Sequence, residues 1–218
     1  SGFFLAKAIE SQNLHKRISL VLIHALGTSR QVIILSIMIA TAFLSMWIAN
    51  VTAALLILPI GMALISKEEA APEQKSSFGT ALMLGIAYSA SIGGTATLIG
   101  SPTNMIFSGV LAKMFPAAPS VSFYDWFIIG FPLAVIFLPL VWFFLIRFFK
   151  VTGSIQGSKE LIKSEIDLMG RMSAGEKRVL VIFILTSLAW IFREEIVIDS
   201  FIIPGWSGIL GLSKFAHD

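Results

Sequence analysis

Cysteine is absent from this 218-residue sequence, and charged residues are scarce. Without cysteine the chain can hold no disulfide, iron–sulfur cluster or thiolate-bound metal. Charged residues make up 13% of the sequence, whereas soluble domains carry about 25%. Apolar residues reach 56%, which leaves too little polar surface for a soluble protein. The composition therefore predicts an integral membrane protein in contact with the lipid bilayer, and the net charge of +3 is too small to indicate a nucleic-acid partner.

Charge and histidine are missing altogether from two long apolar runs, Gln31–Ser66 and Phe78–Ala112. Proton-driven transporters usually bury a carboxylate or a histidine at membrane depth, so a transport function would favour Na⁺ over H⁺ as the coupling ion. The sequence also lacks the His-Glu-x-x-His motif of a membrane metalloprotease and a deep histidine for a membrane serine protease. We therefore predict that the protein is not an enzyme, and we interpret its three histidines as structural or solvated.

The first apolar run has an awkward length for simple membrane crossings. One helical crossing needs about 20 residues and two need about 40, and the run 31–65 lies between these lengths. Two half-depth helices joined by a polar tip near Ile48–Ala53 would fit it. We therefore favour a re-entrant helical hairpin over 31–65, and one long tilted helix is the alternative.

The second apolar run contains residues that interrupt helices. Gly93, Gly94, Gly100 and Pro102 lie close together in its middle. Each glycine weakens a helix by about 1 kcal/mol and a proline by about 3 kcal/mol. We therefore predict a broken transmembrane helix over 78–113, made of two half-helices and an unwound link. Small residues also serve helix–helix contacts in membranes, and the stretch GIAYSASIGG fits that interpretation equally well.

Broken backbone at mid-depth implies a cavity or a binding site, because unsatisfied backbone groups are costly in lipid. Free carbonyls at a half-helix C-terminus suit a small cation, and free N–H groups at a half-helix N-terminus suit an anion. Neutral hydrogen-bonding side chains flank both interruptions: Ser45, Asn50, Thr52, Ser101, Thr103 and Asn104. The two asparagines are the hardest of these to explain by packing, because a buried amide needs several partners.

Five regions are expected along the chain. In order, they are the end of a spanning helix with an interfacial amphipathic helix (1–30), the hairpin and the broken helix (31–113), a transmembrane helix (123–149), a cytoplasmic amphipathic linker (150–177), and a transmembrane helix with a short apolar segment (178–218). Basic residues gathered between Arg147 and Arg178 place the linker in the cytoplasm. Because the sequence opens without Met inside an apolar run, we expect a piece of a longer protein.

Two stretches, FLSMWIANVTAALLILPI and GIAYSASIGGTATLIGSPTN, resemble the divalent anion/sodium symporter family, the sodium-coupled di- and tricarboxylate carriers. The resemblance covers nearly the whole chain. It implies a full transporter with two inverted repeats, each with a re-entrant hairpin and a broken helix, that works as a homodimer with an elevator-like movement of the transport domain. This chain would be the first repeat of an all-α membrane protein, and alone it would not transport. The resemblance implies that region 1–30 holds the end of a scaffold helix, that 31–113 is half of the transport domain, and that 178–218 starts the second repeat.

The resemblance also implies a Na⁺ site and part of a substrate site. The Na⁺ ligands would be the carbonyls of Ser45, Ala49 and Gly100 and the side chain of Asn50. The residues bordering a substrate carboxylate would be Asn50, Thr52, Ser101, Thr103 and Asn104. The family's Ser-Asn-Thr hairpin tip reads ANV here, and its Gly-Thr-Pro-Pro-Asn-like stretch reads GSPTN, so the identity of the substrate is left open.

The sequence therefore favours part of a sodium-coupled symporter that carries dicarboxylates, or tricarboxylates such as citrate, across the cytoplasmic membrane. A sulfate or other oxyanion permease of the same superfamily is one alternative. A membrane subunit with a structural or channel role, and no transport of its own, is the other.

Overall fold

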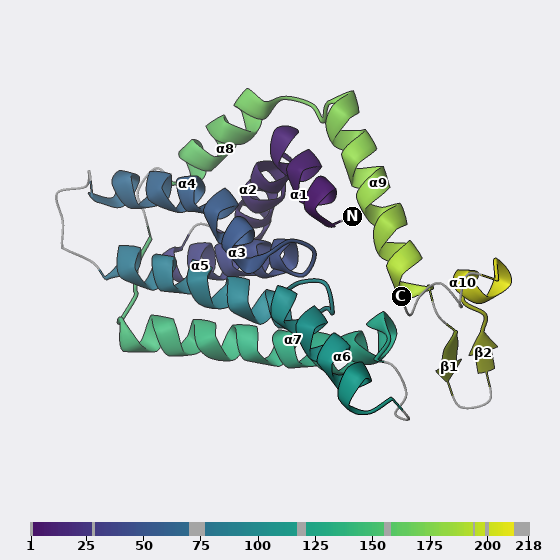
Figure 1. Ribbon diagram of the computed structural model, residues 1–218. Coiled ribbons are helices and arrows are strands. Elements are labelled where there is room, and N and C mark those ends of the chain that lie inside the picture. Colours follow the sequence, from purple (N-terminus) through teal and green to yellow (C-terminus); the bar gives the residue numbers. More distant parts are fainter. Residues whose placement is uncertain are drawn as a thin grey trace.

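The computed structural model describes residues 2–27, 29–69, 77–116, 121–154, 158–193, 195–198 and 201–211 (Figure 1). Parts of the predicted linker at 150–177 and of the predicted region 178–218 lie outside these residues. The described helices are α1 (Gly2–Ser11), α2 (Leu14–Leu26), α3 (Arg30–Ser45), α4 (Asn50–Glu69), α5 (Phe78–Thr95), α6 (Pro102–Met114), α7 (Phe123–Phe148), α8 (Ser158–Met169), α9 (Ala174–Ile191) and α10 (Trp206–Ile209). The prediction of a helical protein is thus confirmed for most of the described chain.

One short strand pair departs from the all-α prediction. Strands β1 (Ile196–Ile198) and β2 (Phe201–Ile203) pair antiparallel, with Ile196 opposite Ile203. Strand β2 lies in the stretch SFIIPGWSGILGL, which was predicted as a short apolar segment of the region 178–218, and β1 lies just before that stretch. Isoleucine and valine, which are branched at Cβ, dominate both strands, and such residues favour extended backbone. A brief apolar run does not by itself distinguish a strand from a helix, so the sequence pattern was ambiguous here.

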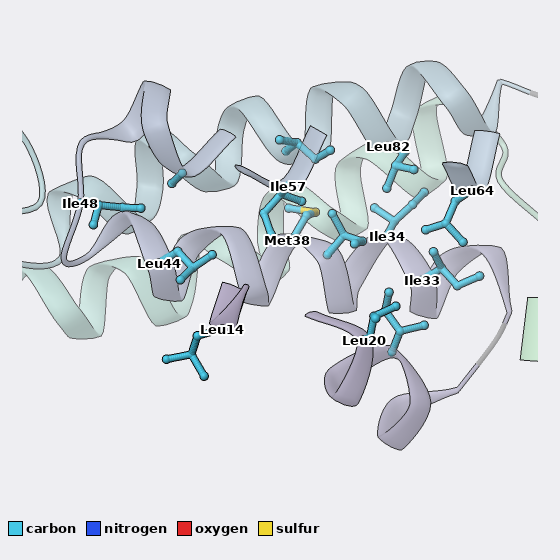
Figure 2. Packing of buried hydrophobic residues seen from close by; sticks show 14 of the residues in the cluster. Leu14, Leu20, Ile33, Ile34, Met38, Leu44, Ile48, Ile57, Leu64 and Leu82 are labelled. Carbon is cyan, nitrogen blue, oxygen red and sulfur yellow. The ribbon is translucent and has the colours of Figure 1, made fainter. Parts of the chain in front are cut away.

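Helices α3 and α5 form the centre of the bundle. Helix α5 also packs against α4 and α7, while α2 covers another side of α3 (Figure 1). The α3 side chains Ile33, Ile34, Ile37 and Met38 have no solvent exposure (Figure 2). Because α3 meets neighbours on several sides, it is apolar around most of its circumference and shows no single polar stripe.

Small residues let α3 and α5 approach closely. A methyl group on Gly93 of α5 would lie 2.1 Å from the carbonyl oxygen of Ala42 in α3. A methyl group on Gly85 would lie 3.1 Å from the Met38 side chain. Part of the glycine-rich stretch therefore serves helix packing, which was one of the two interpretations of the sequence.

Two described helices are long and apolar enough to cross a membrane, judged by length and composition: residues Asn50–Glu68 of α4 and the whole of α7. Helix α7 exposes a series of large apolar side chains, among them Leu140, Phe143 and Phe144. A soluble monomer rarely exposes so continuous an apolar surface. This surface is consistent with contact between α7 and lipid or further protein.

Helices α3 and α4 form a helical hairpin, whose tip is the turn at residues 46–49. At the other end, which we call the hairpin base, the Arg30 guanidinium forms an ion pair with Glu68 at 2.9 Å. Arg30 also donates a hydrogen bond to the Thr152 carbonyl at 2.9 Å, and its backbone N–H donates to the Gly153 carbonyl at 3.1 Å. The hairpin base is therefore tied to the chain that follows α7.

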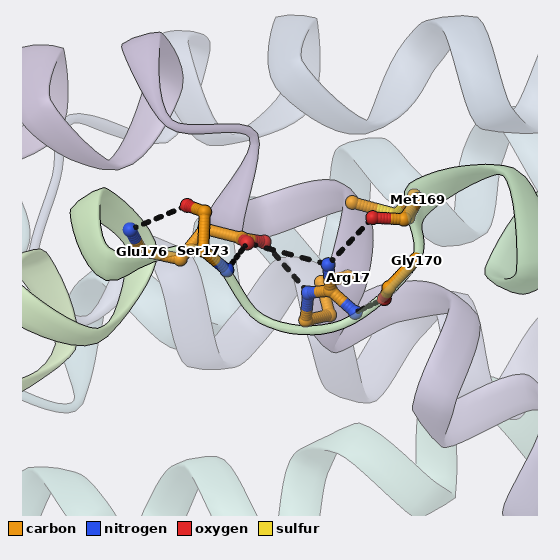
Figure 3. Close-up of polar contacts among 5 residues, drawn as sticks. All are labelled: Arg17, Met169, Gly170, Ser173 and Glu176. Atoms are coloured by element: carbon orange, nitrogen blue, oxygen red, sulfur yellow. Dashed lines mark hydrogen bonds and ion pairs between the residues drawn. The ribbon is translucent and has the colours of Figure 1, made fainter.

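A second ionic contact, which we call the linker clamp, joins α2 to the start of α9 (Figure 3). The Arg17 guanidinium pairs with the Glu176 carboxylate at 2.6 Å and donates to the carbonyls of Met169 and Gly170 at the end of α8. Glu176 also accepts from the backbone N–H of Ser173, which caps α9. The hydrogen bonds from Arg17 lower the pKa of Glu176, and the clamp fixes α8 and α9 against α2.

Candidate functional site

The helix interruptions predicted from the glycines and from the polar hairpin tip lie against each other. Helix α5 ends at Thr95 and α6 begins at Pro102, so residues 96–101, the helix break, are not helical. A methyl group on Gly100 in the helix break would lie 2.9 Å from the carbonyl oxygen of Ser45, which ends α3. The structure thus brings Ser45 and Gly100, two of the predicted Na⁺ ligands, into contact.

Asn50 meets Ser45 at the same place. The Ser45 hydroxyl lies 2.5 Å from the Ala90 carbonyl oxygen and 3.1 Å from Oδ1 of Asn50. The Ser45 hydroxyl has only one hydrogen. When this hydrogen is donated to the Ala90 carbonyl, no hydrogen lies between the Ser45 hydroxyl oxygen and Oδ1 of Asn50. A bound cation would stabilise this pair, and so would a rotated Asn50 amide that presents its NH₂ to Ser45.

Gly94 leaves the room that Asn50 occupies. A methyl group on Gly94 would lie 2.0 Å from Oδ1 of Asn50, far inside contact distance, so any other residue here would displace the amide. Ala49 directly precedes Asn50, and its carbonyl accepts the backbone N–H of Ala53 at 3.0 Å as α4 begins. The predicted Na⁺ ligands therefore occupy one small region, with Ala49 at its edge.

Asn104 is buried beneath this region and stabilises the helix break. Its NH₂ donates to the carbonyls of Gly94 and Thr97, each at 2.9 Å, and the side chain is 8% exposed. The first bond satisfies a carbonyl that α5 leaves free as it ends, and the second holds a carbonyl of the helix break. The structure thus gives both amide hydrogens of Asn104 an internal partner, so only its oxygen is left to approach a substrate.

The other predicted substrate residues occupy the first turns of α4 and α6. Ser101 caps α6, where its hydroxyl accepts the backbone N–H of Thr103 at 3.4 Å, and Pro102 follows as the first helical residue. Ser101 is partly exposed and Thr103 is exposed. Thr52 is partly exposed in the first turn of α4. Both turns present backbone N–H groups that have no partner within their own helix, which is a favourable environment for an anion.

The carbonyls of Ser45 and Gly100 are among those of the described residues that remain without a donor where the interruptions meet. Among the hydrogen bonds of the described residues, none uses the carbonyl of Ser45 or that of Gly100. By contrast, the carbonyls of the α5 end are taken by Asn104 and by Trp126, whose indole N–H donates to Thr95 at 2.9 Å. Neutral oxygens of this kind are suitable ligands for a small, hard cation.

The two segments that carry these oxygens, residues 31–66 and 78–112, contain no charged residue and no histidine. No group of three or more His, Asp or Glu side chains that could hold a metal occurs among the described residues. Burial lowers the pKa of His15, but this residue belongs to α2. The candidate site therefore relies on neutral oxygens and on helix ends rather than on charged groups.

Three contributors to the site were not identified from the sequence. Thr97 joins the helix break to the hairpin tip, Trp126 on α7 caps α5, and Gly94 makes room for Asn50. Thr97 and Gly94 stand inside the stretch that marked the break, but nothing local indicates their partners. No sequence signal pointed to the bond of Trp126 with Thr95.

Comparison with known proteins gives two kinds of match. The family model described as "Sodium:sulfate symporter transmembrane region" matches residues 1–212. The chain is 39% identical to the sodium-dependent dicarboxylate transporter SdcS of Staphylococcus saprophyticus over 214 residues, which is 94% of this chain and 40% of that protein. It is also 39% identical to SdcS of Staphylococcus aureus over 201 residues, which is 88% of this chain and 38% of that protein. The chain therefore spans about 40% of the length of these relatives.

Proposed function

Because the chain belongs to the family of sodium:sulfate symporter transmembrane regions, we propose that it is part of a sodium-coupled transporter of di- or tricarboxylates in the cytoplasmic membrane. The family is one of integral membrane transporters rather than enzymes, in agreement with the composition. The observation that carries the proposal is the convergence of Ser45, Asn50 and Gly100 in a region without charged side chains. The sodium dependence in the names of the relatives supports it.

Na⁺ would bind where the hairpin tip meets the helix break. The carbonyls of Ser45 and Gly100 have no donor among the described residues, and the side-chain oxygen of Asn50 lies 3.1 Å from the hydroxyl of Ser45. With the nearby carbonyl of Ala49, these groups would replace part of the hydration shell of the ion. Because all of these ligands are neutral, bound Na⁺ would leave a net positive charge that attracts an anion.

The substrate carboxylate would bind beside this charge. The first turns of α4 and α6 offer backbone N–H groups and the hydroxyls of Thr52, Ser101 and Thr103, and Asn50 borders both the ion and the anion. A carboxylate and a sulfate both suit such donors, so a sulfate transporter, which the name of the family model also allows, is the second candidate. The family's hairpin tip reads Ser-Asn-Thr, whereas this chain has Ala49 and Val51 on either side of Asn50. This difference leaves the identity of the anion open between a carboxylate and a sulfate.

In the whole protein, the α3–α4 hairpin would be re-entrant, and the broken helix α5–α6 would complete this half of the transport domain. Helix α7 would cross the membrane, α8 would lie in a cytoplasmic linker, and α9 would begin a second, inverted repeat. The remaining length would supply the other half of the substrate site. We further propose that the full-length protein is a homodimer and that this part alone does not transport.

Uptake by the full-length protein tests the proposal. Reconstituted in liposomes, it should accumulate labelled succinate when Na⁺ is present outside and should not do so with K⁺ in its place. Asn50→Ala should reduce uptake about 100-fold or more, because a misplaced or missing ligand commonly costs that factor. Uptake that ignores Na⁺, or that survives in the Asn50 variant, would contradict the proposal. Uptake of labelled sulfate in preference to succinate would favour the second candidate.

A further inference from the structure

Thr97 lies between the hairpin tip and the helix break and contacts both. Its side chain has no solvent exposure. Its hydroxyl donates to the carbonyl oxygen of Met46 in the tip and accepts the backbone N–H of Gly100 at 3.0 Å. Because a hydroxyl has one hydrogen and two lone pairs, one side chain can make both bonds at once. A continuous path of hydrogen bonds therefore runs from Gly100 through Thr97 to Met46.

This arrangement differs from that of an ordinary buried threonine in a membrane helix. Thr41 in α3 is equally buried, but its hydroxyl donates to the carbonyl of Ile37 one turn earlier in the same helix, at 2.7 Å. The hydroxyl of Thr97 instead reaches a residue 51 positions away in the sequence. The bond of Thr41 adds little to tertiary structure, whereas the bonds of Thr97 join two separate segments.

Both anchored atoms are close along the chain to carbonyls that have no donor. Met46 directly follows Ser45, whose carbonyl has no donor among the described residues. Gly100 is itself a residue whose carbonyl has none there. Asn104 holds the carbonyl of Thr97 at 2.9 Å, so the backbone at Thr97 is fixed as well as its hydroxyl. The distance between the Ser45 and Gly100 carbonyls therefore depends on the hydroxyl of Thr97.

We propose that Thr97 is a positioning residue for the sodium site: it does not touch the ion, but it sets the separation of the carbonyls that bind it. This inference rests on the proposed function, because it assumes that those carbonyls are sodium ligands. Without the hydroxyl, the carbonyl of Met46 loses its buried donor, while the amide of Gly100 keeps only its bond to the Thr97 carbonyl at 3.3 Å, so the hairpin tip is no longer held to the helix break and the two segments separate or rotate. The apparent affinity for Na⁺ then falls, although every ligand is still present.

The test is the Na⁺ dependence of succinate uptake by the full-length protein in liposomes, with Thr97→Val compared with Thr97→Ser. Valine keeps the shape of threonine without the hydroxyl, and serine keeps the hydroxyl. Thr97→Val should raise the Na⁺ concentration for half-maximal uptake about tenfold, which is a typical consequence of losing one buried hydrogen-bonded partner. Thr97→Ser should stay near the wild type, and a normal Na⁺ dependence in Thr97→Val would overturn the proposal.

Thr41→Val is the matched control, because it makes the same chemical change at an equally buried position. It should leave the Na⁺ dependence unchanged, and equal shifts in both valine variants would assign Thr97 a general structural role and refute the inference. If Thr97→Val does not fold, Thr97→Ala takes its place as the variant without a hydroxyl. The same rise in the Na⁺ concentration for half-maximal uptake is then expected. Failure of both variants to fold, while Thr41→Val folds, would also refute it. Wild-type uptake that does not need Na⁺ would instead refute the proposed function itself.

Discussion

The meeting point of the hairpin tip and the helix break is held together by neutral groups, whereas the hairpin base and the linker clamp are held by ion pairs. At the tip, hydroxyl, amide and indole groups of Thr97, Asn104 and Trp126 bond to backbone carbonyls. At the base and in the clamp, partly exposed arginines pair with the buried carboxylates of Glu68 and Glu176. The difference agrees with the proposed re-entrant topology, in which the tip lies at membrane depth, where burying charge is costly, and the base lies near the surface, where it costs less.

The two regions also differ in how completely their polar groups are used. At the hairpin base, Arg30 has a carboxylate and a backbone carbonyl as partners for its side chain. At the tip, the carbonyls of Ser45 and Gly100 have no donor among the described residues. A closed network stabilises the fold, whereas open carbonyls leave capacity for a ligand. Substitutions at the tip should therefore change transport, and those in the ionic contacts should change stability.

The largest effect is expected from Gly94→Ala. The added methyl group would lie 2.0 Å from Oδ1 of Asn50, so the amide has to leave its place beside Ser45. A displacement of this size should reduce sodium-dependent uptake by the full-length protein about 100-fold or more. Gly109→Ala in α6 is the control, because a methyl group there meets nothing within 4 Å. Comparable uptake by the two variants, at equal protein levels in the membrane, would contradict the tight fit of Asn50.

The second effect concerns stability and should come from Glu176→Gln. The substitution removes the charge that Arg17 faces in the linker clamp, where the Glu176 side chain is 6% exposed. Loss of a charge-assisted hydrogen bond of this kind costs about 2 kcal/mol, measured as a lower free energy of unfolding of the full-length protein in detergent. Glu10→Gln is the control, because its ion pair with Lys7 has a Glu10 side chain that is 44% exposed. An equally large effect at Glu10 would contradict a special role for burial.

The contribution of Glu176 should also depend on pH. Arg17 lowers the pKa of this carboxyl below its ordinary value of 4.5, so the folded state favours the ionised form more than the unfolded state does. The stabilisation is therefore fully present above pH 4.5 and is lost as the pH falls through the lower pKa of the folded state. The difference in stability between wild type and Glu176→Gln should shrink over that window. A difference that stays constant down to the acid limit would contradict the ion pair as its source.

The sequence was sufficient to locate the ends of several helices but not to pair them. Glycine and proline mark the break between α5 and α6, because this signal is local. The hairpin tip was predicted near Ile48–Ala53, but the turn lies at residues 46–49, and Asn50 and Thr52 belong to the first turn of α4. The contacts that build the site are not local. Thr97 and Met46 are 51 positions apart, and Arg17 and Glu176 are 159 apart, so their pairing depends on how the helices pack.

The roles of Asn50 and Asn104 show how far side-chain chemistry alone can lead. Both were singled out because an amide in hydrocarbon needs several partners. For Asn104 the structure supplies them within the protein, at Gly94 and Thr97. Asn50 instead faces the hydroxyl of Ser45, which has a nearer acceptor in Ala90. The two residues look alike in sequence. Only the structure distinguishes Asn104, whose amide hydrogens have partners within the protein, from Asn50, whose amide remains available to a ligand.

The smallest of these effects should come from removing one indole hydrogen bond in each region. Trp126 donates to Thr95 beside the helix break, and Trp142 on the same helix donates to Gln31 near the hairpin base, each at 2.9 Å. Replacement by Phe removes either bond and keeps an aromatic ring, at a cost of about 1 kcal/mol. Thermal unfolding of the full-length protein should therefore show a small loss of stability in both variants.

Sodium-dependent uptake should separate the two variants. In Trp126→Phe the end of α5 loosens next to the carbonyls of the candidate site, so uptake at low Na⁺ should fall about fivefold, the factor that corresponds to one such bond. In Trp142→Phe the loss occurs where Arg30 and Glu68 already hold the chain, so uptake should stay near the wild type. Because helix α7 carries both tryptophans, a general loosening of α7 would lower uptake equally in the two variants. That result would mean that the tip and the base are not separate in function, although they differ in chemistry.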